Sequence, residues 1–182
     1  MRTVALYGGS FDPPHRGHEA VVKALLELEY LDKIIIMPTF LNPFKENFFA
    51  PAHLRLAWLE EIFLDEKKVE VSAFEVEKRR KVPTIETIEF LSEKYSKIFL
   101  VIGADNLKSL KQWHRFEELN KRVDFIVASR DNINIPQKFT SLKVDMPIAS
   151  SDLRECFDVK KLVAINAEKI KKYYKENNER QN

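Results

Sequence analysis

The residues best suited to chemistry are concentrated in YGGSFDPPHRGH, residues 7–18, which holds three of the four glycines and two of the four histidines of the chain. An imidazole can donate hydrogen bonds to phosphate oxygens, and glycine lets a ligand approach the backbone closely. His15 and His18 are therefore candidates for binding a phosphate group beside a tight turn at Gly8 and Gly9. The competing interpretation is an ordinary turn with a half-buried histidine pair, but the flanking glycines favour the phosphate site.

The residues around this segment predict a strand, a turn and a helix. The apolar run TVALY, residues 3–7, is typical of a buried strand, and the two prolines that follow exclude helix before His15. A helix is then expected over residues 17–30. The free N–H groups and the positive dipole end at its start would face the end of the strand, which is an arrangement that binds anions.

The segment GGSFDPPHRGH resembles the signature of the nucleotidyltransferase superfamily, which carries a His-x-Gly-His motif. The resemblance implies transfer of a nucleotidyl group, and it does not select the substrate. The residues that match this signature are Gly8, Gly9, Ser10, Phe11, Asp12, Pro13, His15, Gly17 and His18. Of these, the resemblance places ATP against Gly8, Gly9, Ser10, Phe11, His15 and His18.

A second segment, VIGADNLKSLKQWHRFEEL at residues 101–119, also follows an apolar strand. It resembles the Gly-Ala-Asp and Trp segment of bacterial nicotinate-nucleotide adenylyltransferases. The resemblance implies that Gly103 and Asp105 contact the nucleotides and that the indole of Trp113 stacks on the nicotinate ring, as aromatic faces do with flat heteroaromatic rings. The alternatives are a helix cap for Asp105 and a core anchor for Trp113.

A third segment, PIASSDLRE at residues 147–155, resembles the Ile-Ser-Ser-Thr/Ser-x-Ile-Arg box near the C-terminal end of the same enzymes, with Ala149 where a serine is usual. Ser150, Ser151 and Arg154 match this box, and the resemblance implies that they bind the far phosphates of ATP. On its own this segment would favour a plain serine N-cap and a surface arginine.

Two weaker matches are Lys45 in LNPFK and Thr84 in VPTIET. Phe44 stands where the family has a histidine, and Pro83 departs from the family's Ser-Tyr-Thr-x-Asp-Thr pattern. The alternatives are a solvated loop lysine at Lys45 and a helix cap at Thr84. The resemblance assigns nicotinate mononucleotide to Ser10, Lys45, Thr84, Asp105 and Trp113.

The three segments together imply a nicotinate-nucleotide adenylyltransferase, which makes deamido-NAD and pyrophosphate from ATP and nicotinate mononucleotide. His15, His18, Lys45 and Arg154 would be its catalytic residues. Mg²⁺ would be bound mainly through ATP, with no metal site built from protein ligands. The alternatives are another adenylyltransferase of the superfamily, such as the phosphopantetheine type, which Trp113 argues against, and a nucleotide-binding sensor without turnover.

These side chains must be positioned by a layered fold. Six segments predict strands, at residues 3–7, 33–38, 68–76, 97–103, 123–129 and 141–147. Helical patterns alternate with them, which predicts an α/β fold: a Rossmann-like, doubly wound, mainly parallel sheet with helices on both faces. Residues 1–182 are expected to form a single nucleotidyltransferase domain. Its last part, residues 166–182, is expected to be a polar helix that frays near its end.

Composition limits the partners of the protein. A net charge of +2 is too small to indicate nucleic acid or an anionic membrane. The single cysteine, Cys156, excludes an intramolecular disulfide, the N-terminus lacks a signal-peptide pattern, and no apolar run reaches the roughly 20 residues that span a bilayer. We therefore expect a cytoplasmic protein whose partners are ATP and nicotinate mononucleotide. The sequence leaves its oligomeric state open.

Overall fold

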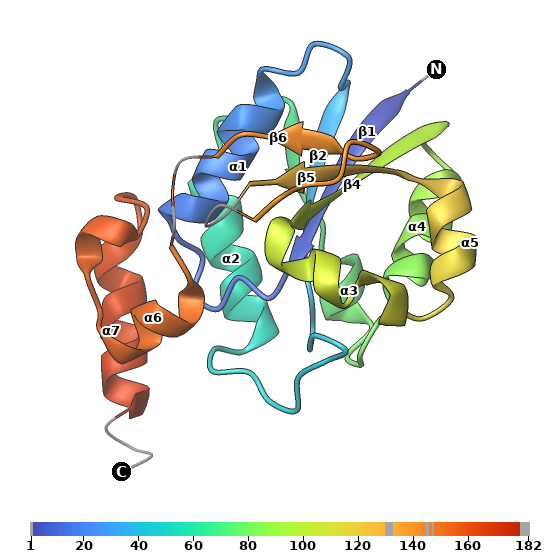
Figure 1. Cartoon of the computed structure of the whole chain (residues 1–182). Helices are drawn as coiled ribbons and strands as arrows, with labels where there is room; N and C mark the ends of the chain where they lie inside the picture. The colour runs from blue at the N-terminus through green and yellow to red at the C-terminus, as the bar shows by residue number, and fades with distance from the viewer. Residues whose placement is uncertain (1, 130–132, 145, 147, 179–182) are drawn as a thin grey trace.

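A six-stranded parallel sheet forms the centre of the molecule (Figure 1). The computed structural model describes residues 2–129, 133–144, 146 and 148–178. The strands are β1 (Thr3–Gly9), β2 (Lys33–Pro38), β3 (Val69–Val71), β4 (Lys97–Gly103), β5 (Asp124–Ala128) and β6 (Thr140–Leu142). Their order is β3-β2-β1-β4-β5-β6, and each of these pairings is parallel. This order confirms the Rossmann-like, doubly wound sheet that the sequence predicts.

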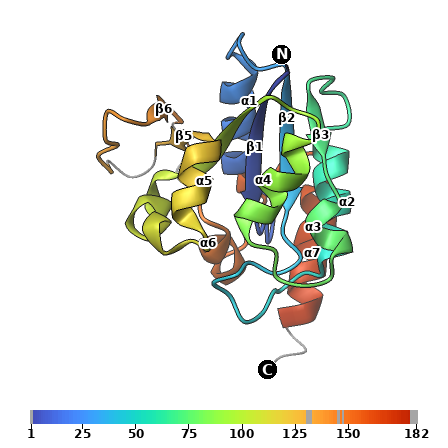
Figure 2. The same cartoon turned by 90° about the vertical axis from the view of Figure 1, so that its right-hand side faces the viewer.

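Helices cover both faces of the sheet. The helices are α1 (Arg16–Leu26), α2 (Ala52–Ile62), α3 (Phe74–Glu77), α4 (Thr84–Ser92), α5 (Phe116–Arg122), α6 (Ser150–Glu155) and α7 (Ala167–Asn178), with 3₁₀ turns η1 (Ala104–Lys108), η2 (Leu110–Gln112) and η3 (Val159–Lys161). Alternate side chains of β1 enter different cores: Val4 and Leu6 pack with α4 and α5, whereas Ala5 packs with α1 and α2. Figure 2 shows α4 and α5 in front of the strands, with α1 behind them.

The strand order reverses between β1 and β4, which lie side by side at the centre of the sheet. Tyr7 of β1 lies opposite Val101 of β4, so that the carboxyl ends of both strands reach the same edge. Ligands of doubly wound sheets bind at such a switch point. The first two sequence segments begin at these two strand ends.

The expected strand over residues 68–76 is wrong in its second half, where the chain forms α3 instead. The N–H of Ser72 donates to the carbonyl of Ile36 at 2.9 Å. The next bond of a parallel ladder would need an N–H at Pro38, which has none. The pairing therefore ends, and the chain turns into a short helix.

Two other expectations need adjustment. The helix predicted over residues 17–30 runs only from Arg16 to Leu26. The predicted strand at 141–147 is observed over Thr140–Leu142, and its positions 145 and 147 lie outside the described residues.

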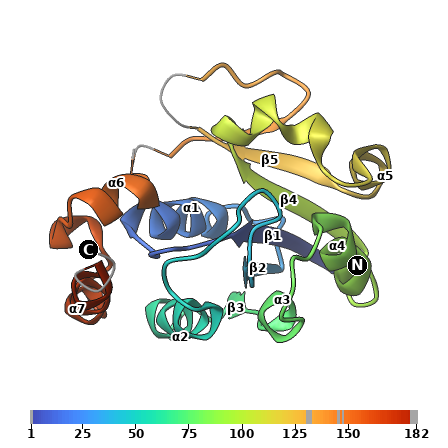
Figure 3. The same cartoon turned by 90° about the horizontal axis from the view of Figure 1, so that it is seen from below.

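The C-terminal segment packs through a third apolar core. It joins Trp58 of α2, Leu153 of α6, and Ile170 and Tyr174 of α7. Figures 1 and 3 show α6 and α7 on the side of the molecule where α1 and α2 lie. The predicted fraying falls on residues 179–182, which lie outside the described residues, and the single domain stays a prediction. No helix in the described part of the chain is long and apolar enough to cross a bilayer.

Candidate active site

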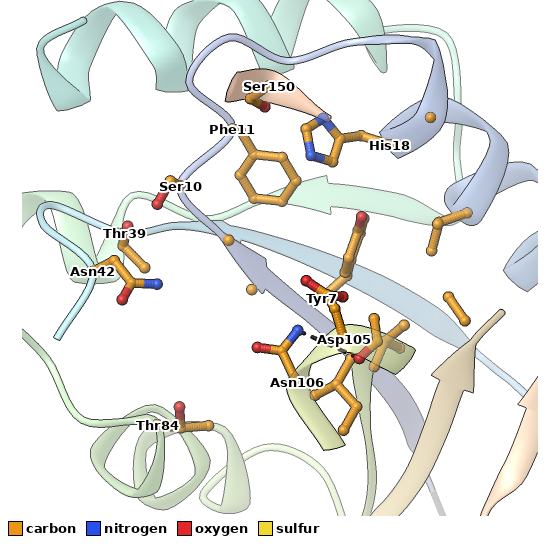
Figure 4. A pocket seen from close by; sticks show the side chains of 18 of the residues that line it. Tyr7, Ser10, Phe11, His18, Thr39, Asn42, Thr84, Asp105, Asn106 and Ser150 are labelled. Atoms are coloured by element: carbon orange, nitrogen blue, oxygen red, sulfur yellow. Dashed lines mark hydrogen bonds between the residues drawn. The ribbon is translucent and has the colours of Figure 1, made fainter. Parts of the chain in front are cut away.

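A cavity of about 640 Å³ opens at the carboxyl ends of β1 and β4 (Figure 4). Residues from all three sequence segments line it. The predicted site residues along its wall are Gly8, Gly9, Ser10, Phe11, His15, His18, Lys45, Thr84, Gly103, Asp105, Trp113, Ser150, Ser151 and Arg154. The structure thus brings every predicted site residue into one place, while the role of each stays a prediction.

The chain leaves β1 by a turn at Phe11. Gly8 and Gly9 continue the strand, and no glycine of the described chain has a positive φ, so the tight turn expected at these glycines is wrong. Phe11 instead adopts a left-handed φ of 49°. Its ring is 2% exposed and packs edge-on against Tyr7 and His18, with centroids 5.4 and 4.8 Å apart (Figure 4). The buried ring anchors a backbone conformation that is uncommon outside glycine.

The two histidines form the start of α1. His15 is the N-cap, and its Nδ1 accepts from the N–H of Gly17 at 3.1 Å. The Nδ1 of His18 accepts from the N–H of His15 at 3.2 Å, and the two rings stack with centroids 3.6 Å apart. Because each Nδ1 is an acceptor, the neutral rings carry their protons on Nε2, the atom that can donate to a ligand. A Cβ on Gly17 would lie 2.9 Å from the ring of His15, so a glycine is needed there.

Arg55 of α2 holds the loops around the cavity, a role that sequence analysis missed. The side chain is 1% exposed, and burial lowers the pKa of its guanidinium, an effect that the charge of Asp12 opposes. Its nitrogens donate to the backbone carbonyl oxygens of Ser10, Thr39, Phe40 and Ala50. The available signal was a lone arginine within the apolar stretch HLRLAWL.

Asp12 is the second anchor of these loops that sequence analysis missed. It is 3% exposed, and its carboxylate accepts from the N–H groups of Phe49 and Ala50 at 2.8 and 3.0 Å and from the hydroxyl of Tyr174. Its backbone carbonyl accepts from Nη1 of Arg154. One residue therefore joins the histidine loop to the loop before α2, to α6 and to α7.

At the end of β4, glycine makes room for a carboxylate. A Cβ on Gly103 would lie 2.4 Å from Oδ1 of Asp105. Gly103 occupies the N-cap position of η1 without a side-chain cap bond, so the cap alternative for Asp105 is not supported. Trp113 packs against the core under α4 and α5 and also lines the cavity. Its Nε1 is buried without a hydrogen-bond partner in the described chain. Packing and cavity lining coexist, and stacking on a ligand stays a prediction.

The start of α6 is attached to the histidine loop. Its N-cap is Ala149 without a side-chain cap bond, so the serine-cap alternative is wrong. The hydroxyl of Ser150 donates to the carbonyl of Pro13 at 3.0 Å. Arg154 lies 4.3 Å from the ring centre of Phe49.

Lys45 and Arg154 meet at one end of the cavity. Loss of solvation and then the positive charge of Arg154 lower the pKa of Lys45. Two cations that act on each other in a cavity wall form a site that favours phosphate.

Glu75 of α3 is a buried carboxyl group in the cavity wall that sequence analysis missed. It is 5% exposed, and its Oε1 accepts from the hydroxyl of Thr87 at 2.6 Å. Its Oε2 is buried without a partner among the described residues. Burial raises the pKa of Glu75 to about 7, against the opposing hydrogen bond from Thr87. Thr84 begins α4 nearby; Pro83 is the N-cap without a side-chain cap bond, so the cap alternative for Thr84 is not supported.

The metal chemistry of the cavity depends on its oxygen donors. Among the described residues, no group of three or more histidine, cysteine, aspartate or glutamate side chains could hold a metal ion. Asp105 is a carboxylate in the wall, and phosphate oxygens of a nucleotide would supply further ligands of the kind that Mg²⁺ takes. The donor set therefore fits a cation that arrives with the nucleotide, and the absence of a protein-built metal site stays a prediction.

The cytidylyltransferase-like family model matches residues 6–156. A probable nicotinate-nucleotide adenylyltransferase of Sulfurimonas denitrificans is 57% identical over 176 residues, which cover 97% of each chain. Another from Campylobacter jejuni is 45% identical over 173 residues, which cover 94% of this chain and 96% of that one. The Plasmodium falciparum nicotinic acid mononucleotide adenylyltransferase, solved in complex with NaAD, has a TM-score of 0.79 at 21% identity, with 96% of this chain and 98% of that one covered. At this identity the structural likeness concerns the fold.

Proposed function

Because the chain belongs to the cytidylyltransferase-like family and is 57% identical to a nicotinate-nucleotide adenylyltransferase, we propose that it transfers the adenylyl group of ATP to nicotinate mononucleotide in NAD biosynthesis. The products are deamido-NAD and pyrophosphate. The observation that carries the proposal is the meeting of three separate phosphate- and ring-binding segments in one cavity. We place the reaction in the cytoplasm, with these two small molecules rather than nucleic acid or membranes as partners.

The reaction is an in-line displacement at phosphorus. An oxygen of the mononucleotide phosphate forms a bond to the α-phosphorus of ATP, and the bond to pyrophosphate breaks. The nucleophile is already an anion, so positioning and charge stabilisation supply most of the catalysis. His15 and His18 donate from Nε2 to the transferring group, with His18 nearest to it. Lys45 and Arg154 neutralise the departing phosphates.

We assign Mg²⁺ as the companion of ATP in this cavity. Asp105 and the phosphate oxygens are the donors that would hold it. When bound, the ion would neutralise phosphate charge, as Lys45 and Arg154 also do. The strand-end glycines let phosphates approach the backbone.

The acceptor end of the cavity contains the aromatic residue that selects the substrate class. The indole of Trp113 provides a flat face for a pyridine ring, and Thr84 and Asp105 line the same cavity. A pantetheine arm offers no ring to stack. This observation favours nicotinate mononucleotide over the acceptor of a phosphopantetheine adenylyltransferase.

Pyrophosphate release from ATP over a panel of acceptors tests the proposal. Nicotinate mononucleotide should support turnover, and phosphopantetheine should not. Turnover with phosphopantetheine alone would identify the other adenylyltransferase. Nucleotide binding without pyrophosphate release for any acceptor would identify a sensor.

A further inference from the structure

Neutral donors bind the buried carboxylate of Asp12. Oδ2 accepts from the N–H of Phe49, and Oδ1 accepts from the N–H of Ala50 and from the hydroxyl of Tyr174. The residue is 3% exposed, so water is not an abundant substitute for any of these donors. The negative charge is thus stabilised by three hydrogen bonds.

Three cationic side chains surround this carboxylate without pairing with it. The charge of Asp12 acts on Lys45 and Arg55, and its backbone carbonyl accepts from Arg154. Within the described part of the chain, no cation forms an ion pair with the carboxylate of Asp12. Arg55 is engaged by backbone carbonyls. Lys45 and Arg154 line the cavity, where phosphates would meet them.

Tyr174 supplies the donor that comes from farthest along the chain. It lies on α7, beyond residues 6–156 that the family model matches. Its ring is 1% exposed and is packed by Trp58 and Phe157, with centroids 6.0 and 5.3 Å away. Burial and the charge of Asp12 raise the pKa of Tyr174 far above its ordinary value, so the hydroxyl is a neutral donor at any physiological pH.

We propose that Tyr174 is a positioning residue of the active site, whose hydroxyl saturates Asp12 so that Lys45 and Arg154 remain available to the phosphates of ATP. The proposal rests on the proposed adenylyl transfer. A buried anion that loses a donor is strongly destabilised unless another donor replaces it. Lys45 and Arg154 are the cavity-lining cations beside Asp12, and either one drawn to its carboxylate is withdrawn from ATP. The loop held by Phe49 and Ala50 would loosen at the same time.

The test compares Tyr174→Phe with Tyr173→Phe as its matched control. Both variants keep an aromatic ring in the same core, and only the first removes the bond to Asp12. We expect Tyr174→Phe to raise KM for ATP about tenfold, as loss of a hydrogen bond to a charged group does, with KM for nicotinate mononucleotide little changed. Hydrogen exchange of the Phe49 and Ala50 amides should also become faster. Tyr173→Phe should match the wild type in both measurements.

A double-mutant cycle identifies the bond responsible. In an Asp12→Asn background, Tyr174→Phe should add little to the rise in KM for ATP, because both changes act through one contact. Equal KM values for ATP in Tyr174→Phe and Tyr173→Phe, or a loss of thermal stability without a selective change for ATP, would overturn the proposal. Absence of adenylyl transfer in the wild type would reject the proposed function. Unchanged exchange of the Phe49 and Ala50 amides in Tyr174→Phe would separately reject the positioning role of Tyr174.

Discussion

At the residue scale, His15 and His18 each use one ring nitrogen to hold the backbone at the start of α1. The opposite nitrogen of each ring is then a donor whose direction is fixed before a ligand arrives. Such preorganised donors stabilise charge in a transition state without reorganising at the moment of reaction. The observed structural role is therefore compatible with the proposed chemical role of the same side chains.

His18→Ala should keep the fold and lower the rate of adenylyl transfer by about two to four orders of magnitude, because it removes a preorganised donor. His53→Ala is the control, since His53 is an exposed histidine of α2 outside the cavity. Circular dichroism checks folding, and single-turnover kinetics measure the rate. A folded His18→Ala protein with normal turnover would remove His18 from the mechanism.

Glu75 makes stability depend on pH. Its pKa is about 7 in the folded protein against 4.5 ordinarily. Below pH 4.5 the carboxyl is therefore protonated in the folded and the unfolded protein, and it does not lower the free energy of unfolding. As the pH rises from 4.5 to 7, the unfolded chain releases a proton that the folded protein keeps, so up to about 3 kcal/mol of unfolding free energy is lost by pH 7. Glu75→Gln should remove this loss. Urea unfolding should therefore show that the free energy of unfolding of the variant exceeds that of the wild type by much more at pH 8 than at pH 5.

The control for this experiment is Glu77→Gln, an exposed glutamate of the same helix. Its pH dependence should match that of the wild type. Parallel stability curves for Glu75→Gln and the wild type would show that the carboxyl of Glu75 titrates as an ordinary surface group.

The sequence predicted which residues line the cavity better than how they are held. His15 and His18 were identifiable as cavity residues from their types and spacing, and Trp113 from the resemblance to the adenylyltransferase segment. Asp12 and Arg55 act through backbone groups, most of which lie 15 to 45 positions away, as in the bonds from Arg55 to Phe40 and Ser10. Such partners depend on tertiary packing, which no local pattern contains.

At the element scale, α6 is a six-residue helix whose function depends on its attachments. Leu153 is fully buried in the third core, Ser150 is bonded to the histidine loop, and Arg154 reaches the carbonyl of Asp12. The helix therefore places Arg154 at the cavity by contacts at both of its ends. Its short length makes these contacts more important than helix propensity.

Arg154→Ala should raise KM for ATP more than KM for nicotinate mononucleotide, because we propose that its guanidinium binds the far phosphates of ATP. The control is Arg122→Ala, which removes an exposed arginine paired with Glu118 outside the cavity. Steady-state kinetics with each substrate varied in turn provide the measurement. Equal effects on the two substrates would contradict the assignment.

Among the elements, the prediction from sequence failed where one local pattern was compatible with more than one structure. The alternation in VSAFEV fits a strand, yet Pro38 on the neighbouring strand cannot supply the next ladder bond. The polar composition of α7 concealed an apolar stripe at Ile170, Tyr173 and Tyr174, which has helical spacing. The stripe was visible in the sequence, but the surface that it covers was not.

At the scale of the whole molecule, several elements contribute chemically different side chains to one cavity. His18 on α1 and Arg154 on α6 line it, as do Thr84 at the start of α4 and Trp113 after η2. The order of the strands places these elements on neighbouring sides of one sheet edge. The phosphates and the pyridine ring of the two substrates can thus be bound by separate groups.

Nicotinate mononucleotide should be preferred over nicotinamide mononucleotide as acceptor. A carboxylate needs donors only, whereas an amide NH₂ needs acceptors, and a site built for one pattern rejects the other strongly. Trp113→Ala should lower kcat/KM for both acceptors and preserve much of the ratio between the two values, because the indole offers the same stacking face to both rings. Phe90→Ala, at an exposed ring outside the cavity, should change neither acceptor.

The ratio of kcat/KM for the two acceptors decides this prediction. Equal use of both acceptors by the wild type would reject the preference. Loss of the ratio in Trp113→Ala would mean that the indole also orients the groups at the ring edge.

The bond between Asp12 and Tyr174 closes a loop of 162 positions, and this has a consequence in time. Closing the chain between such distant residues costs conformational entropy before the contact contributes favourable free energy, so we expect these contacts to form late in folding. The strands and their covering helices can assemble while α7 is still undocked. During refolding from urea, the far-ultraviolet circular dichroism should therefore recover before enzymatic turnover does, and simultaneous recovery would contradict this order. We therefore expect the docking of α7 to be the last step in the maturation of this enzyme.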